Sequence, residues 1–501
     1  MNQKKTGTIL SYVNILISTL TTLFYTPVMI KFLGNAEYGV YRLSISIVSY
    51  LGLLSLGFAG SYVKFYYRYK THDNEEGIAK LNGLFMSFYI IVSLIALISG
   101  NIISENIGFF LQGKMAPSEI SLSSGLMKIF TLNMALTFPA SLFESYMTAN
   151  ERFIVLRIIM LARGVLNPFL GVPLLILGYR SFGLGIAVTF ATVSSLALNA
   201  YYCIKKIGMK FNFKKPDFLL FKEIAIFSSF LFFNIIIDQI NWNVDQFIIG
   251  KFVGSIAVAT YSIGAVINQL FLATSTAVSN VFVPQVNRIV EKGHKENKNM
   301  NSELTSLMTR IGRVQYYILM LVLIGFITVG HYFITVLWLD SAYTSSYYVA
   351  LILVVPVIVP LIQNVGIEIQ RAKNMHAFRS LLYLLIAIFN VIISIPLAKK
   401  HGDIGAAIGT AIGLTIGNVF IMNWYYHAKV GLDMSFFWKN ILQATKGMLP
   451  AALLSFLFLK TETENLSTFI LKSAAILVVY IFFVWHFSFN EYEKKLLKKG
   501  E

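Results

Sequence analysis

Charge is scarce in this 501-residue sequence: 13% of the residues are charged, whereas 56% are hydrophobic. Soluble domains typically have about 25% charged residues, so this composition excludes an ordinary water-soluble fold. Cysteine is scarcer still, since Cys203 is the single one, and an internal disulfide is therefore impossible. The seven histidines lack metal-ligand spacing, and we find neither a Gly-rich phosphate-binding loop nor a nucleophile elbow. We expect no enzymatic activity, no ATP hydrolysis, no metal and no cofactor.

Long apolar runs dominate the sequence instead. A membrane-spanning helix needs about 20 mainly apolar residues. The run that follows the basic start extends to about Leu33, which is too long for the core of a signal peptide, so we interpret it as the first span. The sequence predicts an all-α polytopic membrane protein with fourteen spans, at 8–33, 39–62, 79–103, 122–147, 154–177, 182–204, 222–249, 258–284, 312–338, 345–368, 378–398, 404–427, 441–459 and 468–488.

The basic residues orient these spans. Of the 41 Lys and Arg residues, 30 fall in the segments on the side of the N-terminus and nine in the segments between them, while Lys128 and Arg163 lie within spans. Basic loops mark the cytoplasmic side, so we expect both termini in the cytoplasm. The net charge of +17 is explained by this orientation and by contact with anionic lipid headgroups. No nucleic-acid partner is needed, and no loop is long enough for a catalytic domain.

The sequence contains an internal repeat. At a shift of 220 residues, Lys31-Phe32-Leu33-Gly34 aligns with Lys251-Phe252-Val253-Gly254, and at 224, Tyr201-Tyr202 aligns with Tyr425-Tyr426. Six spans per repeat give both halves one orientation, and transporters of this kind bind substrate between the halves and expose it alternately to each side. We therefore predict an N-terminal six-helix lobe at 1–210, a second at 211–435, and an appended transmembrane hairpin with a basic cytoplasmic tail at 436–501.

The first helix of each predicted half carries one polar stripe. In span seven the polar residues are spaced by 4, 3 and 4, which places them on one helical face. Such a stripe cannot face lipid tails cheaply, so one interpretation is a wet central cavity. The alternative is that Asn234 and Asn241 bridge neighbouring helices while Asp245 lies in the outer interface. The stripes consist of Asn234, Asp238, Asn241 and Asp245 in span seven and Asn14, Ser18, Thr21 and Tyr25 in span one.

Arg163 lies near the middle of span five. A charge at that depth costs about 2.5–3.5 kcal/mol on insertion scales, so something must offset it. One hypothesis is an anion site, because the guanidinium fork matches phosphate, diphosphate or an acidic sugar; Asn167, one turn further on, belongs to the same candidate cavity. The other is a structural ion pair with Asp238 or Glu144. Glu144 and Glu368 are otherwise expected near the inner ends of their spans, either as interfacial anchors or as ion-pair partners of Arg152 and Arg371.

Three segments resemble one protein family. They are Tyr25-Thr26-Pro27-Val28-Met29-Ile30-Lys31-Phe32-Leu33-Gly34 with Glu37-Tyr38-Gly39-Val40-Tyr41; Asp245-Gln246-Phe247-Ile248-Ile249-Gly250 with Tyr261-Ser262-Ile263-Gly264; and Glu144-Ser145-Tyr146 with Asn150-Glu151-Arg152-Phe153. On these residues the chain resembles bacterial lipid-linked oligosaccharide flippases of the O-antigen/capsule type. That family belongs to the multidrug/oligosaccharidyl-lipid/polysaccharide exporter superfamily.

The resemblance implies a fold and a cargo. The fold would be that of the multidrug exporters, two six-helix lobes forming a V, and the cargo an undecaprenyl-diphosphate-linked sugar repeat unit turned from the inner to the outer leaflet. It also implies membrane lipids, a coupling ion (H⁺ or Na⁺), a polysaccharide polymerase and a chain-length regulator as partners. The hairpin resembles the added helices of lipid II flippases, but span one lacks the Arg expected of them. A cation-coupled multidrug or small-molecule exporter is the alternative, although its usual acid in the first helix is missing here.

The predicted topology can be tested by cysteine labelling or reporter fusions. Because the basic loops alternate with the spans, positions near 72, 210, 295 and 435 should be cytoplasmic, and positions near 110, 340 and 463 should be external. Placement of residue 295 and the N-terminus on opposite sides of the membrane would contradict the two six-span halves.

Overall fold

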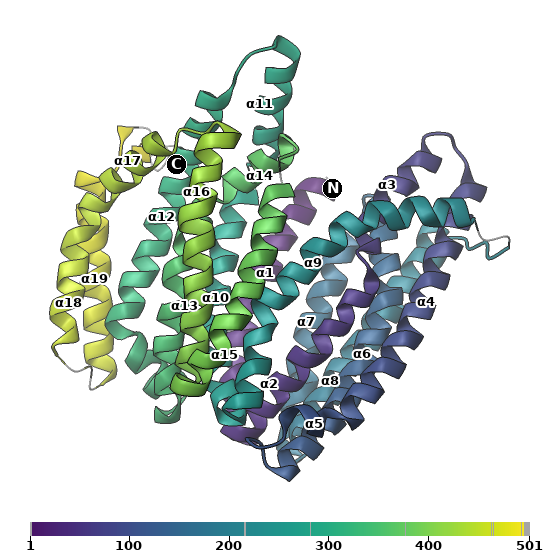
Figure 1. The fold of residues 1–501 in the computed structure, drawn as a ribbon, viewed down its shortest axis with the longest axis horizontal. Helices are drawn as coiled ribbons and strands as arrows, with labels where there is room; N and C mark the ends of the chain where they lie inside the picture. The colour runs from purple at the N-terminus through teal and green to yellow at the C-terminus, as the bar shows by residue number, and fades with distance from the viewer. Residues whose placement is uncertain are drawn as a thin grey trace. The chain divides into compact units, whose positions relative to one another are not determined.

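The computed structural model describes residues 3–214, 217–280, 282–375, 377–461, 463, 465–491 and 493–494. In this part of the chain the regular structure is helical throughout, without strands (Figure 1). The chain forms two compact units, Met1–Ala259 and Thr260–Glu501. The all-α fold expected from the apolar runs is therefore confirmed.

The first unit is a helical bundle in which α4 and α8 pack on α6, and α7 packs on both α1 and α8 (Figure 1). Its last helix continues into the second unit. The elements are α1 (Gln3–Leu33), α2 (Asn35–Ser49), η1 (Tyr50–Ser55), α3 (Phe58–Lys70), α4 (Glu75–Glu105), α5 (Ile107–Leu111), α6 (Pro117–Ala149), α7 (Phe153–Ile176), α8 (Arg180–Tyr201), η2 (Tyr202–Ile207), α9 (Phe218–Phe252) and the start of α10 (Ser255–Asn280).

Glu37 and Gly39, from the first segment that resembles the flippase family, explain how helices meet in this unit. The Glu37 carboxylate on α2 accepts hydrogen bonds from Arg180 Nε at 2.7 Å and from the Ser181 backbone N–H at 3.0 Å, which attaches the start of α8 to α2. Gly39 lies against the start of α10, where a Cβ atom would stand 1.9 Å from the Ser255 carbonyl oxygen. A side chain at Gly39 would therefore separate the two helices.

The second unit contains a bundle and a hairpin. Gly402, with φ 64° and ψ −140°, divides the long helix α15 into two helical segments. The elements are α11 (Val283–Glu296), α12 (Asn301–Tyr332), η3 (Phe333–Trp338), η4 (Ser341–Tyr343), α13 (Thr344–Ile362), α14 (Asn364–Ala372), α15 (Ala377–Leu414), η5 (Thr415–Ile421), α16 (Met422–Tyr425), η6 (Tyr426–Val430), α17 (Met434–Thr445), η7 (Lys446–Met448), α18 (Leu449–Leu459) and α19 (Leu466–Phe487).

Twelve helical segments among the described residues are long and apolar enough to cross a membrane. The count of fourteen spans stays a prediction. Predicted spans 378–398 and 404–427 fall together in the single segment Ala377–Val430, which Gly402 interrupts. Predicted span 222–249 falls in α9, where several side chains lie outside the described part of the chain. The chain is in any case a multi-pass membrane protein.

Two predicted boundaries differ from the observed ones. The inner segment 285–311 was expected to be a loop, but α11 and the first turns of α12 occupy most of it, because a helix can continue past the hydrocarbon into the headgroup region. Helix α9 packs on α2 and α3 of the first unit, so the compact units divide after Ala259. The lobes at 1–210, 211–435 and 436–501 remain a prediction about the sequence repeat.

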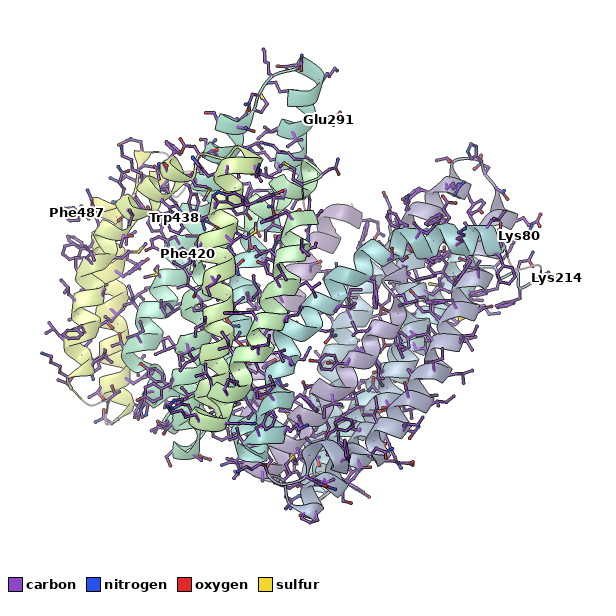
Figure 2. The ribbon with its side chains drawn as sticks, viewed as in Figure 1. Lys80, Lys214, Glu291, Phe420, Trp438 and Phe487 are labelled. Carbon is purple, nitrogen blue, oxygen red and sulfur yellow. The ribbon has the colours of Figure 1, made fainter. Side chains whose placement is uncertain are left out.

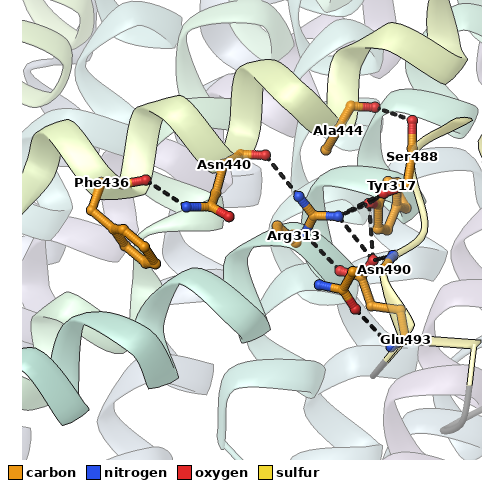
Figure 3. Close-up of polar contacts among 8 residues, drawn as sticks. All are labelled: Arg313, Tyr317, Phe436, Asn440, Ala444, Ser488, Asn490 and Glu493. Atoms are coloured by element: carbon orange, nitrogen blue, oxygen red, sulfur yellow. Dashed lines mark hydrogen bonds and ion pairs between the residues drawn. The ribbon is translucent and has the colours of Figure 1, made fainter.

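The C-terminal hairpin is attached to α12 by a buried ion pair (Figure 3). Arg313 on α12 is 4% exposed and Glu493 is 5% exposed. Arg313 Nε donates to Glu493 Oε1 at 2.6 Å and Nη2 donates to Oε2 at 2.9 Å, while Nη1 donates to the Asn440 carbonyl at 2.8 Å. Tyr317 and the Ser488 carbonyl complete the set of acceptors around the guanidinium. We had counted Arg313 among the inner loop cations; the structure shows it as a buried structural residue.

We expect Arg313→Leu to lower the free energy of unfolding by about 3–5 kcal/mol, because it leaves the Glu493 carboxylate buried and unpaired. The double variant Arg313→Leu/Glu493→Leu should recover part of this loss. Thermal unfolding of the purified protein in detergent measures both. The control is Arg371→Leu, whose ion pair with Glu368 at 2.7 Å is largely exposed and should contribute about 0–1 kcal/mol. Equal destabilisation by the two single variants would contradict the proposed role of the buried pair.

Candidate functional site

Arg163 lines a cavity of about 370 Å³ inside the first unit. The walls come from α6, α7 and α8, and Arg163 and Asn167 stand one helical turn apart on α7. The structure therefore brings together these two predicted site residues. The cavity-lining residues are Glu144, Met160, Arg163, Gly164, Asn167, Val188, Ala191 and Ser195.

The guanidinium of Arg163 is held by a short chain of hydrogen bonds. Arg163 Nη2 donates to Thr192 Oγ1 at 3.1 Å, and Thr192 Oγ1 donates in turn to Asn133 Oδ1 at 2.9 Å. Thr192 and Asn133 are both buried. An Arg side chain has five N–H donors, and the remaining ones on Arg163 have no hydrogen bond to a described protein group. The fork is thus oriented from one side and keeps most of its donors for the cavity.

A single acid faces Arg163 across this cavity. Arg163 and Arg157 both interact electrostatically with the Glu144 carboxylate, whereas we had expected Glu144 beside Arg152. No described carboxylate lies within 4.0 Å of the Arg163 guanidinium, so the predicted ion pair with Glu144 is not formed at contact distance. The other predicted partner, the Asp238 side chain, lies outside the described part of the chain.

Several polar residues of this site escaped the sequence reasoning. Asn133, Thr192 and Ser195 are small polar residues on α6 and α8 that come from different apolar runs. An Asn in the middle of the run 122–147 is the one signal that pointed to the site. Asn133 Nδ2 and Asn167 Oδ1 are buried without a hydrogen-bond partner in the described residues, and of these two residues Asn167 lines the cavity, where its Oδ1 is an acceptor.

The stripe on α1 divides into two parts. Thr21 and Tyr25 line an apolar groove of about 420 Å³ between α1 and α7, together with Pro168. The Tyr25 hydroxyl packs over Gly171, where a Cβ atom would lie 1.9 Å away. Asn14 and Ser18 lie nearer the start of α1, and Ser18 Oγ donates to the Ile15 carbonyl at 3.0 Å. The groove therefore flanks the same turn of α7 that carries Asn167.

The stripe on α9 is described only at its end. The side chains of Asn234, Asp238 and Asn241 lie outside the described residues. Asp245 is 2% exposed and interacts electrostatically with Tyr50. Two other residues of α9, Gln239 and Asn243, face α2 and were not among the predicted site residues. Ser49 Oγ donates to Gln239 Oε1 at 3.2 Å, and Ser46 Oγ donates to the Asn243 carbonyl at 2.8 Å. Whether the stripe lines a central cavity stays a prediction.

The fold and this site define a class of protein. A solved structure described as the lipid II flippase MurJ in an inward closed conformation superimposes with a TM-score of 0.70 at 16% identity, covering 95% of this chain and 97% of that one. An inward-facing MATE family multidrug transporter of the MOP superfamily gives 0.61 at 14%, covering 85% and 99%. The chain has the fold that these two transporters share.

Its family follows from sequence. The family model described as "Polysaccharide biosynthesis protein" matches residues 28–338, more than half of the chain, and the chain belongs to that family. It is 23% identical over 405 residues to a Shigella flexneri protein named as an O-antigen transporter, covering 79% of this chain and 90% of that one. A Haloferax volcanii protein named as the flippase AglR is also 23% identical, over 412 residues, covering 79% and 77%. The resemblance to O-antigen/capsule flippases is confirmed, and the chain is a flippase-type transporter of polysaccharide biosynthesis.

The cavity should be wet, which thiol chemistry can test. Because a thiolate forms in water and not in lipid, Gly164→Cys and Asn167→Cys should react with a water-soluble thiosulfonate reagent. The control is Ile158→Cys on the same helix, a position that is 51% exposed but does not line the cavity. The natural Cys203 is buried and should stay unmodified. Equal reaction at 158 and 167 would remove the case for a water-filled site around Arg163.

Proposed function

We propose that this protein carries an undecaprenyl-diphosphate-linked oligosaccharide repeat unit from the inner to the outer leaflet of the bacterial cytoplasmic membrane. The transport supplies O-antigen, capsule or another surface polysaccharide, proceeds by alternating access with both termini in the cytoplasm, and involves no covalent chemistry. A coupling ion, H⁺ or Na⁺, drives the cycle, and the polymerase and chain-length regulator act on the exported unit. The observation that carries the proposal is the Arg163 cavity, a cation held within a transmembrane bundle with donors to spare.

The chemistry of this cavity suits a diphosphate. Thr192 holds one edge of the Arg163 guanidinium at 3.1 Å, which presets its plane for two parallel bonds to phosphate oxygens. Asn167 and Ser195 add neutral polar groups along the wall, of the kind that hydrogen-bond to sugar hydroxyls. The Glu144 carboxylate repels an anionic ligand from its part of the cavity, so an anionic group is directed towards Arg163.

An apolar surface for the lipid chain lies on the same helix. The groove between α1 and α7 is walled by Ile17, Leu20, Phe24, Val28 and Val172. Pro168 lines this groove and Asn167 lines the polar cavity, so consecutive residues of α7 serve the two surfaces. A polyprenyl diphosphate has the same division between an anionic head and an apolar chain, which is why we assign the head to the cavity and the start of the chain to the groove.

A second candidate function rests on Glu144. A partly buried carboxylate beside a cavity is also suited to an exporter of cationic drugs, and the fold is shared with MATE transporters. In that case Glu144→Gln should abolish tolerance of cationic dyes in a sensitive host, and Arg163 should be dispensable. We favour the flippase because most of the fork donors of Arg163 have no hydrogen bond to a described protein group.

Variants of Arg163 separate a binding role from a structural one. We expect Arg163→Ala to reduce surface-polysaccharide export to less than about a tenth of wild type, since charge-assisted hydrogen bonds contribute about 1.5–3 kcal/mol each. Arg163→Lys keeps the charge without the planar fork and should retain partial export. Thr192→Val should weaken export without abolishing it, because it frees the guanidinium to turn. Export is measured by immunoblotting of surface polysaccharide at matched protein levels.

The control is Lys128→Ala, which removes the other charge placed within a span but whose exposed ion pair with Glu105, at 3.2 Å, lies away from the cavity. It should leave export unchanged. If Arg163→Ala is instead degraded and is rescued by neutralising Glu144, Arg163 is a structural residue. Full export by a stable Arg163→Ala protein would remove it from the mechanism.

A further inference from the structure

A larger cavity, of about 670 Å³, lies elsewhere in the first unit, between α4, the connector that follows η2, and the start of α9. Lys80 and Lys214 mark it in Figure 2, where both stand at the same end of the unit. This end contains the basic segments 63–78 and 205–221, which the charge pattern places on the cytoplasmic side. The cavity therefore lies at the level of the inner leaflet, apart from the Arg163 site.

The connector is fixed against α4 by its backbone. The Asn212 N–H donates to the Ala79 carbonyl at 2.9 Å, and Asn82 Nδ2 donates to the Lys210 carbonyl at 2.8 Å. Gly83 permits this approach, since a Cβ atom there would lie 2.2 Å from the Asn212 carbonyl oxygen. The wall that carries Lys214 is thus a built part of the bundle and not a loose loop.

Among the described residues that line the mouth of the cavity, two are cations and two are anions. Lys80 pairs with Glu76 at 2.7 Å and also interacts electrostatically with Asp217. Asp217 is held in place because its Oδ1 accepts the Leu220 N–H at 2.9 Å. Lys214 has no ion pair within the described residues. Among the described lining residues the charges therefore balance, and Lys214 remains outside any contact pair.

The inner wall of the cavity is apolar. Phe88, Ile91 and Phe221 line it, with Phe218 at its edge. Ile91 is 56% exposed and Phe218 is 78% exposed, so these side chains face the surface of the unit. Phe88 is braced by stacking on Phe58, with ring centroids 3.9 Å apart. A polar mouth above an apolar wall at the membrane interface is the arrangement that an amphiphile matches.

The geometry points to a binding site for one inner-leaflet phospholipid whose headgroup carries a primary ammonium as well as its phosphate. The phosphate binds between Lys214 and Lys80, the ammonium binds Asp217 and Glu76, and one acyl chain lies along Phe88 and Ile91. A zwitterionic headgroup leaves no charge at the mouth unpaired, whereas an anionic headgroup would leave the two carboxylates facing it. A quaternary ammonium cannot donate hydrogen bonds to those carboxylates. This site is independent of the transport function proposed above.

Native mass spectrometry of the delipidated full chain can test the site with three lipids of identical acyl chains: phosphatidylethanolamine, phosphatidylglycerol and phosphatidylcholine. Wild type should retain one phosphatidylethanolamine most strongly. In Glu76→Gln/Asp217→Asn the mouth becomes cationic, and the preference should invert by about tenfold towards phosphatidylglycerol, as the loss of charge-assisted hydrogen bonds requires. Asn at 217 can still cap α9, so the fold should be preserved.

Two matched controls make the test specific. Glu223→Gln removes a carboxylate at the same end of the unit, but one that pairs with Arg68 at 2.6 Å outside the cavity, and should leave the preference unchanged. Ile91→Trp fills the apolar part and should lower retention of all three lipids, whereas Ile90→Trp, at an exposed position that does not line the cavity, should not. A wild-type preference for phosphatidylglycerol, retention of a polyprenyl phosphate in place of phospholipid, or equal effects of the 90 and 91 variants would overturn the proposal.

Discussion

Hydrocarbon offers no hydrogen-bond partner, so every polar group placed at membrane depth must find one within the protein or in water that the protein admits. Two arginines on transmembrane helices answer this constraint in opposite ways. Arg313 is 4% exposed and is surrounded by acceptors, with both oxygens of Glu493 and two backbone carbonyls bound to its fork. Arg163 has one hydrogen bond to the described residues, to Thr192, and faces a cavity. An arginine whose donors are bound to protein acceptors attaches one element to another, whereas an arginine with donors to spare remains able to bind a ligand.

The residues by which the chain resembles its family are mainly residues that hold helices together. Glu37 attaches α8 to α2, and Gly39 allows the start of α10 to approach α2. Gly250 likewise lies against Leu43, where a Cβ atom would be 2.6 Å away. These contacts determine how the helices of the first unit pack against one another.

The first unit has three surfaces of different chemistry. The Arg163 cavity contains a cation, an acid and neutral polar groups, the groove between α1 and α7 is apolar, and the described lining of the cavity around Lys80 and Lys214 has charges of both signs at the mouth and apolar side chains within. A lipid-linked oligosaccharide needs the first two together, because its head and its chain have opposite solubilities. The third suits a resident lipid of the inner leaflet. In two of them a side chain is braced by a neighbour, Arg163 by Thr192 and Phe88 by Phe58, as a site that must keep its geometry requires.

Hydropathy and charge in the sequence alone determined that the chain crosses the membrane many times, that it is helical, and which loops are basic, because a span is a local property of about 20 consecutive residues. They also identified Arg163 and Asn167, since a polar residue in an apolar run is conspicuous by itself. Only the tertiary structure decided what these residues face. Thr192, Ser195 and Asn133 lie on other helices, and Glu493 meets Arg313 across 180 residues of chain. Sequence periodicity shows which residues share a face of one helix. Contacts between different helices depend on how the helices pack, and a local sequence pattern does not specify that packing.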